Sequence, residues 1–309
     1  MLKVVALFIV GLVLICVGGD KLVDAAVVIA RKLGIPQIVV GATIVSLGTT
    51  LPEVLVSTTA AVQGSVAITA GNSIGSIICN TTLIEGLSQL IRPTKDVNVK
   101  PLRWRAAFFF ASMIIVNIIS YFAGGLYMVP GIILCLAFVA YAYLNIKFPG
   151  DEDDEEEKPE GNVIKEIVIL AICAAALYLG AKLLVDNGVI IAEALGVPER
   201  VIAVTFIALG TSLPELMTSI ISLIKGYGSV GIGNILGANI LDLLLVLGIP
   251  AMIRGYEVSS QTSMIDMPIG LGVMAILFVP ILIKKRAYRW QGALLLLIYA
   301  GYCAMTFTM

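Results

Sequence analysis

Two glutamates stand in matching surroundings inside segments that are otherwise apolar. Glu53 lies in the run IVSLGTTLPEV at 44–54, and Glu215 lies in the similar run FIALGTSLPEL at 206–216. An ionisable side chain at mid-membrane depth costs at least ~2.5–3.5 kcal/mol on insertion scales. A matched pair is therefore hard to attribute to chance, and it points to the handling of a cation by carboxylate oxygens.

Other oxygen-bearing side chains accompany the two glutamates. The expected helix that contains Glu53 carries, at three- and four-residue steps along one face, Thr43, Ser46, Thr50 and Glu53. The next helix carries Asn72, Ser76 and Asn80 at four-residue steps, and the equivalent places later in the chain hold Asn234, Ala238 and Asp242. Carboxylates with hydroxyls, amides and carbonyls form an all-oxygen shell, which suits Ca²⁺ or Na⁺ and not a soft transition metal.

A proline precedes each glutamate. Inside a helix, Pro52 and Pro214 would each remove a donor and push away the carbonyl four residues earlier, at Gly48 and Gly210. We therefore expect both helices to open locally and to free carbonyls near 46–49 and 208–211. A bilayer tolerates unpaired carbonyls only where they line a cavity or bind something.

The composition is that of a polytopic membrane protein. Hydrophobic residues make up 59% of the 309 residues and charged residues only 13%, against roughly 25% charged in soluble domains. At about 20 residues per span, we expect ten helices, at 3–30, 36–62, 67–91, 105–123, 127–147, 163–190, 198–224, 229–253, 267–284 and 290–308.

Composition also excludes several classes of protein. The chain has no histidine, so histidine-based catalysis and metal ligation are excluded. A net charge of −1 argues against a nucleic-acid partner. The five cysteines show no CxxC spacing and predict neither disulfides nor a zinc site. No cofactor and no obligatory protein partner is expected beyond the transported ions and the lipid bilayer.

The chain is a duplicated unit. At an offset of 162, residues 33–80 align without a gap to 195–242, and 17 of the 48 pairs are identical. Five helices per half is an odd number, so the second copy must enter the membrane upside down. If both termini are external, fifteen Lys and Arg residues lie on the cytoplasmic side and three outside, as the positive-inside rule requires. Inverted repeats of this kind are typical of secondary transporters, with the site at the midplane.

An acidic segment separates the halves. Residues 150–161 read GDEDDEEEKPEG, with seven consecutive acids that cannot enter a membrane. We expect five-helix repeats at 1–149 and 162–309 and a solvated cytoplasmic linker at 150–161. A weak cation-collecting role for the linker stays open.

Several other residues have an ordinary structural explanation. The spacings Gly71-x3-Gly75 and Gly233-x3-Gly237 are typical of close helix packing. Asn72 and Asn234 fit interhelical hydrogen bonds as well as ion binding. Local pairing with Lys21 or Lys182 is expected for Asp20, Asp24 and Asp186, and Glu85, whose counterpart is Leu247, is interpreted as structural.

The repeats resemble the two alpha repeats of the sodium/calcium exchanger family, within the calcium/cation antiporter superfamily. The motifs that carry the resemblance are GTTLPE, GTSLPE, GNSIGSIICN and GNILGANILD, and the likeness covers nearly the whole chain. The alpha motifs span 36–91 and 198–253. The resemblance implies alternating access and exchange of Na⁺ entering for Ca²⁺ leaving, most simply across the cell membrane.

The resemblance also implies roles for individual residues. Glu53 and Glu215 would be the central Ca²⁺ ligands, helped by the backbone and hydroxyls of Thr49 and Thr211. The remaining expected site residues are Ser46 and Ala208 as carbonyl donors, Thr50 and Ser212 as supports of the unwound turns, Ser76 at a flanking Na⁺ site, and Asn80 and Asp242 at the middle.

Alternatives remain at this stage. Asp242 in place of Asn80 also resembles the potassium-dependent branch, so K⁺ co-transport is open, and H⁺/Ca²⁺ exchange is the other transport alternative. Ala238 in place of Ser76 leaves the number of Na⁺ sites open. An intramembrane aspartyl protease also needs two buried acids, but the chain lacks its paired YD and GxGD signatures. Matched inverted repeats argue against a channel.

Overall fold

The computed structural model describes residues 1–63, 67–148, 162–196, 210 and 212–308. The described part is helical apart from one antiparallel pair of two-residue strands, β1 (Gly125–Leu126) and β2 (Tyr256–Glu257). Eight helices in these ranges are long and apolar enough to cross a membrane. The all-α membrane class expected from composition is therefore confirmed.

The helix bounds follow the apolar segments of the sequence. The first half contains α1 (Leu2–Leu33), α2 (Gln37–Val40), α3 (Ser46–Gln63), α4 (Ala67–Cys79), α5 (Glu85–Ile91), α6 (Val99–Ala123) and α7 (Met128–Lys147). The second half contains α8 (Val163–Ala194), α11 (Leu213–Ile224), α12 (Gly228–Leu241), α13 (Gly248–Ile253), α14 (Met267–Lys284) and α15 (Arg289–Thr308). The start of the helix expected at 198–224 lies outside the described residues.

One helix begins earlier than expected. α6 was predicted from residue 105 but begins at Val99, where the Asn98 side chain caps it by accepting a hydrogen bond from the Lys100 amide at 3.2 Å. The helix continues through the charged residues of its first turns. One of them, Arg105, is buried and donates to Asn145 of α7 at 2.7 Å. Its guanidinium also lies 4.4 Å from the centre of the Trp104 ring.

Within the described ranges, four π-helical turns interrupt the helices. They are η1 (Gly41–Val45), η2 (Asn80–Ile84), η4 (Asp242–Val246) and η5 (Thr262–Asp266). The turns η2 and η4 begin 162 residues apart, at equivalent positions of the two repeats. Single π-helical turns inside α-helices are frequent at functional sites, and these two start on predicted site residues.

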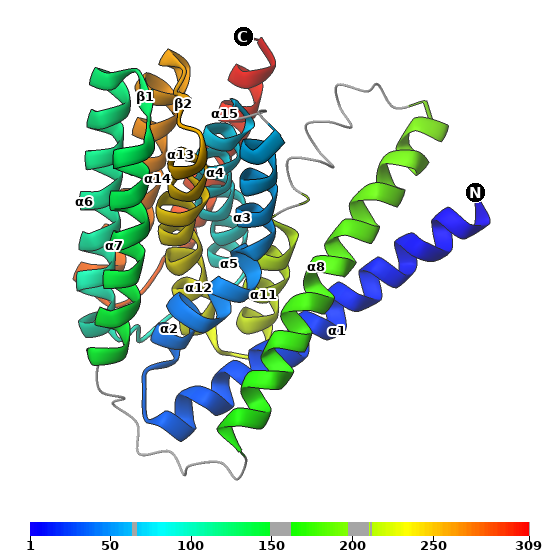
Figure 1. Ribbon diagram of the computed structural model, residues 1–309. Coiled ribbons are helices and arrows are strands. Elements are labelled where there is room, and N and C mark those ends of the chain that lie inside the picture. Colours follow the sequence, from blue (N-terminus) through cyan, green and yellow to red (C-terminus); the bar gives the residue numbers. More distant parts are fainter. Residues whose placement is uncertain (64–66, 149–161, 197–209, 211, 309) are drawn as a thin grey trace.

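The helices form an upright bundle with a tilted pair beside it. Figure 1 shows α1 and α8 crossing the page together, next to the bundle that contains α3 to α7 and α11 to α15. The N-terminus and the C-terminus lie toward the same end of the molecule, whereas the end of α7 and the start of α8 lie toward the opposite end. The chain therefore crosses the bundle an odd number of times before α8.

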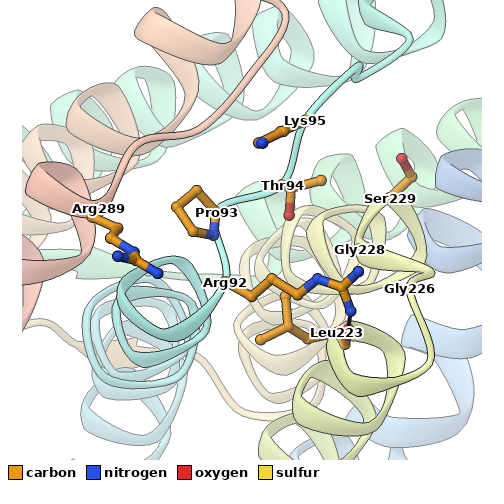
Figure 2. Close-up of a pocket in the computed structure, with 9 residues that line it drawn as sticks. All are labelled: Arg92, Pro93, Thr94, Lys95, Leu223, Gly226, Gly228, Ser229 and Arg289. Atoms are coloured by element: carbon orange, nitrogen blue, oxygen red, sulfur yellow. Dashed lines mark hydrogen bonds between the residues drawn. The ribbon is translucent and has the colours of Figure 1, made fainter.

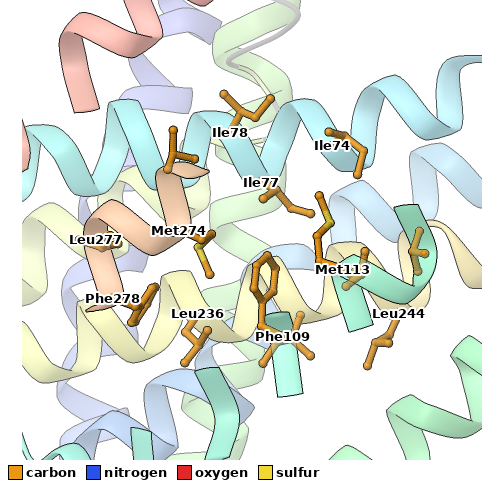
Figure 3. Packing of buried hydrophobic residues seen from close by; sticks show 14 of the residues in the cluster. Ile74, Ile77, Ile78, Phe109, Met113, Leu236, Leu244, Met274, Leu277 and Phe278 are labelled. Atoms are coloured by element: carbon orange, nitrogen blue, oxygen red, sulfur yellow. The ribbon is translucent and has the colours of Figure 1, made fainter. Parts of the chain in front are cut away.

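The main apolar core lies between α4, α6, α12 and α14. Figure 3 shows Ile77 of α4, Phe109 of α6, Leu236 of α12 and Met274 of α14 meeting in this core. All four side chains are fully buried. Dispersion contacts of this kind hold membrane helices together, because lipid tails are as apolar as the side chains themselves.

Glycines let α12 cross the α2–η1 segment with backbones in direct contact. A methyl group built on Gly233 would overlap the carbonyl oxygen of Ile38, and one on Gly41 would overlap that of Val230. A methyl on Gly237 would overlap the Ser46 hydroxyl. The close-packing interpretation is thus confirmed for Gly233-x3-Gly237. At Gly71 and Gly75, an added methyl meets no atom of the described residues within 4 Å.

An ion cluster joins α1 to α11. The Lys225 ammonium lies 2.7 Å from Asp20 Oδ1 and 2.6 Å from Asp24 Oδ1, whereas Lys21 stands 4.0 and 3.9 Å from the same two carboxylates. The expected local pairing of these aspartates with Lys21 is therefore confirmed, but Lys225, about two hundred residues away in the sequence, is the closer partner. Local pairing is confirmed for Asp186, 3.0 Å from Lys182.

We expect Gly233→Ala to destabilise the fold by ~1–3 kcal/mol, because the added methyl overlaps a backbone carbonyl that cannot swing aside. The matched control is Gly272→Ala in α14, where the new methyl meets no described atom within 4 Å. Thermal unfolding in detergent measures both variants. A midpoint for Gly233→Ala at or above that of the control would contradict direct backbone contact between α12 and α2.

Candidate cation site

The two glutamates are buried inside the protein. Each side chain is about 1% exposed. Glu215 lies in the first turn of α11, which begins after Ser212 with Pro214 in its first turn. Free backbone N–H groups at a helix N-terminus favour a negative charge, so α11 helps to hold the Glu215 carboxylate.

The expected opening of the helix before Glu53 is wrong. α3 runs without a break from Ser46 to Gln63 with Pro52 inside it. Pro52 has no backbone N–H to donate to the Gly48 carbonyl. One missing hydrogen bond leaves the helix intact. The irregular backbone lies one turn earlier, in η1, where the Tyr141 hydroxyl donates to the Ala42 carbonyl at 2.9 Å.

The equivalent segment of the second repeat lies outside the described residues. Ala208 and Thr211 fall in it, so their predicted roles stay predictions. Ser212 is described and is 2% exposed at the start of α11. Its neighbour in space is the Cys79 thiol at the end of α4, which also lies within electrostatic reach of Glu215.

Hydroxyls of the first repeat reach polar groups of the second. Thr50 Oγ1 donates to Glu215 Oε1 at 3.2 Å. Thr49 Oγ1 donates to Asn234 Oδ1 at 3.3 Å. Both threonines are buried in α3. The motif GTT before Glu53 therefore contacts α11, which carries Glu215, and the neighbouring helix α12.

Not every predicted hydroxyl turns toward the centre. Thr43 Oγ1 donates to the Val39 carbonyl at 2.7 Å, and Ser46 Oγ donates to the Thr43 carbonyl at 3.1 Å. These bonds run back along their own helix, as is common for such residues in membrane helices. Ser76 is buried one turn before Asn80, and no hydrogen bond joins it to the other site residues that the structure describes.

Asn80 and Asp242 face each other at the two equivalent π-helical turns. Asn80 Nδ2 lies 3.5 Å from Asp242 Oδ2 and donates to Asn239 Oδ1 at 3.2 Å. The Ser73 hydroxyl donates to the Asp242 carbonyl at 2.8 Å. The structure thus brings these two predicted site residues together.

Several oxygens around this centre lack a hydrogen-bond partner. They are buried, and among the described residues none donates to Glu215 Oε2, Asp242 Oδ1, Asn80 Oδ1 or Ser212 Oγ. Buried polar atoms in folded proteins are nearly always satisfied. Buried oxygens that accept no hydrogen bond are available to coordinate a cation.

The electrostatics of the centre favour a cation. The negative charge of Glu215 acts on Asp242, and no described ion pair includes either residue. Within the described ranges, no three carboxylates or thiols converge as a ready metal cluster. A cation held here would therefore be shared between carboxylates and the neutral oxygens of hydroxyls, amides and carbonyls, which is hard-cation chemistry.

Some contributing residues were missed by sequence reasoning. Asn239 fixes the Asn80 amide and itself donates to Thr81 Oγ1 at 2.9 Å. Its equivalent in the first repeat is Ile77, so comparison of the repeats hid it. An amide in an otherwise apolar stretch was the available signal.

Asn72 and Asn234, at equivalent places of the two repeats, both have interhelical partners. Asn72 Nδ2 donates to Ser57 Oγ at 2.9 Å and to the Glu53 carbonyl at 3.4 Å. Asn72 thereby ties α4 to the helix turn that carries the first glutamate. Glu85, interpreted as structural, is buried and accepts a hydrogen bond from Gln89 Nε2 at 2.5 Å.

The chain is similar in sequence to known proteins over nearly its whole length. A family model described as sodium/calcium exchanger protein matches residues 3–147 and 165–308. The chain is 29% identical to the sodium/calcium exchanger MaX1 of Methanosarcina acetivorans, with 96% of each chain covered. It is 32% identical to a membrane protein of Methanocaldococcus jannaschii, covering 96% of this chain and 95% of that one.

The fold also matches a solved exchanger. A structure of the sodium-calcium exchanger NCX_Mj, soaked with 2.5 mM Na⁺ and 10 mM Sr²⁺, superposes with a TM-score of 0.86. The two chains are 32% identical, and the match covers 98% of each.

Proposed function

The chain belongs to the sodium/calcium exchanger family, and from that premise we propose which of its residues carry the exchange of Na⁺ for Ca²⁺. The protein is a secondary antiporter of these two ions. The observation that carries the assignment of the site is the burial of Glu53 and Glu215 at equivalent repeat positions, with Thr50 of one repeat bonded to Glu215 of the other.

The two glutamates are the central Ca²⁺ ligands in this proposal. Ca²⁺ takes six to eight oxygens, so neutral groups complete its shell. The neutral ligands and supports are Thr49, Thr211, Thr50, Ser212 and the carbonyls of Ser46 and Ala208. Ser76 contributes to a flanking Na⁺ site, and Asn80 and Asp242 lie at the middle. The open oxygens of Asn80, Ser212 and Asp242 support these roles.

Competition for the same carboxylates couples the two ions. Two buried negative charges are offset either by one Ca²⁺ or by Na⁺ ions, and leaving both charges uncompensated is costly in a low-dielectric interior. The empty site therefore resists the change from one open side to the other. Exchange, rather than one-way leak, follows from this penalty.

The architecture that we propose is ten membrane helices in two inverted repeats, 1–149 and 162–309, joined by the acidic linker 150–161. Both termini are external, and the linker is cytoplasmic. The equivalent π-helical turns η2 and η4 support the duplication, and the termini at one end of the molecule agree with it (Figure 1). Alternating access then consists of rocking of one part against another around a fixed site.

We expect Glu53→Gln and Glu215→Gln each to lower Na⁺-driven ⁴⁵Ca uptake in proteoliposomes by at least about 100-fold. Each change removes a buried charge partner of the metal, an effect of ~3–5 kcal/mol. The fold should survive, because a neutral amide is cheaper to bury than a carboxylate. The matched control is Glu257→Gln, an exposed glutamate in β2, which should transport like the wild type.

The same vesicles distinguish the alternatives. Uptake that follows an imposed H⁺ gradient and ignores Na⁺ would contradict Na⁺/Ca²⁺ exchange. Wild-type uptake in either site variant, with the control unchanged, would contradict the two-carboxylate site while leaving the antiport itself standing.

Asp242 is neutralised by a proton rather than by K⁺ in our proposal. Ala238, four residues before Asp242 and equivalent to Ser76 of the first repeat, is buried and has no side-chain oxygen. Asn80 already contacts one Asp242 oxygen. Too few oxygens remain for a large second cation. We expect Na⁺-driven Ca²⁺ uptake to be unchanged when choline replaces K⁺. Loss of uptake in choline that Asp242→Asn restores would contradict this.

The inverted topology makes a labelling prediction. Lys95 and Glu257 are exposed and stand at equivalent repeat positions, 162 residues apart. An impermeant thiol reagent should label Lys95→Cys only from the cytoplasmic side and Glu257→Cys only from outside, above the background of the native cysteines. Labelling of both from one side would rule out the inverted arrangement.

A further inference from the structure

A basic pocket lies at the linker end of the bundle, away from the cation site. It has a volume of about 560 Å³ and lies between the loop after α5, the turn between α11 and α12, and the start of α15. Figure 2 shows Arg92, Lys95 and Arg289 around it, with Thr94 between Arg92 and Lys95 and with Ser229 on the side away from Arg289. No acidic residue is among the described residues that line it.

The two arginines are held in place at the rim. Arg92 Nη1 donates to the Leu223 carbonyl at 3.2 Å, and Arg289 Nη2 donates to the Ile91 carbonyl at 3.4 Å. Each guanidinium has five N–H donors, so most of them remain for a ligand. Two arginines and a lysine around one pocket give it the positive charge that an anionic headgroup requires.

The start of α12 adds to the positive potential. This 14-residue helix begins at Gly228, which packs against Thr94 and lines the pocket with Ser229. Its N-terminal N–H groups and dipole favour a bound anion. The adjoining pocket, which shares Ser229, adds Lys100 and Lys285 but also contains Asp96, so the purely basic part is the one in Figure 2.

The surface beside the pocket is apolar. Ile91 is 55% exposed, Ile224 is 71% exposed and Trp290 is 54% exposed. Trp290 follows Arg289 directly, and tryptophans at the ends of membrane helices lie at the level of the lipid headgroups. A ligand with both a phosphate and acyl chains would therefore contact the basic pocket and the apolar side chains beside it. A free phosphate ion would contact only the pocket.

The opposite end of the protein does not repeat this arrangement. The repeat equivalents of Arg92 and Lys95 are Arg254 and Glu257, so one cation is replaced by an acid. At these positions the linker end is therefore more basic than the opposite end. In the proposed topology this end faces the cytoplasmic leaflet, whose anionic lipids attract basic residues.

We propose that the pocket formed by Arg92, Lys95 and Arg289 binds the phosphate headgroup of an anionic phospholipid. The acyl chains lie along Ile91, Ile224 and Trp290. Lipid bound here joins the α5–α6 loop of the first repeat to the α11–α12 turn and the start of α15 in the second repeat. This inference goes beyond the exchange activity, and its test reads binding rather than transport.

The test uses the purified full chain in detergent and follows thermal unfolding while short-chain phosphatidylglycerol is titrated in. We expect a saturable rise in the unfolding midpoint of the wild type. Each basic residue near a lipid headgroup contributes about fivefold in affinity, so Arg92→Gln/Arg289→Gln should weaken binding by about 25-fold. The matched control, Arg254→Gln, should bind like the wild type.

Several results would overturn the proposal. They are an equal response to phosphatidylcholine of the same chain length, an equal response to inorganic phosphate, and undiminished lipid binding by the double variant. If the double variant does not purify in folded form, Lys95→Gln replaces it, with an expected loss of about fivefold. Unchanged affinity in that variant would also count against the pocket. Loss of lipid binding with Na⁺-driven Ca²⁺ uptake retained would leave the exchange function untouched.

Discussion

The burial of carboxylates inside a membrane bundle is the constraint on which the rest of the structure depends. Glu53, Glu215 and Asp242 are each about 1% exposed or less, and no described ion pair includes Glu215 or Asp242. Buried charges are tolerable only when paired or when they coordinate a metal. In this account, a bound cation is therefore part of the stable state, and the ion that leaves must be replaced by another.

Rigid packing gives these carboxylates fixed surroundings. Glycines bring α12 against α2 and η1 at backbone contact, which places Asn234 within reach of Thr49. The amide pair Asn80 and Asn239 then joins α4 to α12 beside Asp242. Hydroxyl and amide oxygens that are held by helix packing need little rearrangement when a cation binds. A preorganised oxygen shell can distinguish ions by charge and size.

Much of this arrangement could be predicted from the sequence, because apolar length, repeat identity and isolated acids are local signals. The helix ranges and the burial of the two glutamates follow from them. The π-helical turns at Asn80 and Asp242 could not be predicted, since a single extra residue in a helical turn leaves no mark on apolar periodicity. Tertiary partners such as Lys225 for Asp24 were equally hidden, because 201 residues separate them. The effect of Pro52 was overestimated, because the loss of one hydrogen bond leaves α3 helical.

The central claim is that a single divalent cation is held between the carboxylates of the two repeats. The most direct test is to grow crystals of the full chain, soak them with Sr²⁺ at low Na⁺, and locate the ion by its anomalous scattering. The account predicts one strong peak in contact with both the Glu53 and the Glu215 carboxylates, which disappears when Na⁺ is raised. A peak that touches neither glutamate, or Sr²⁺ bound equally well by Glu53→Gln/Glu215→Gln, would contradict it.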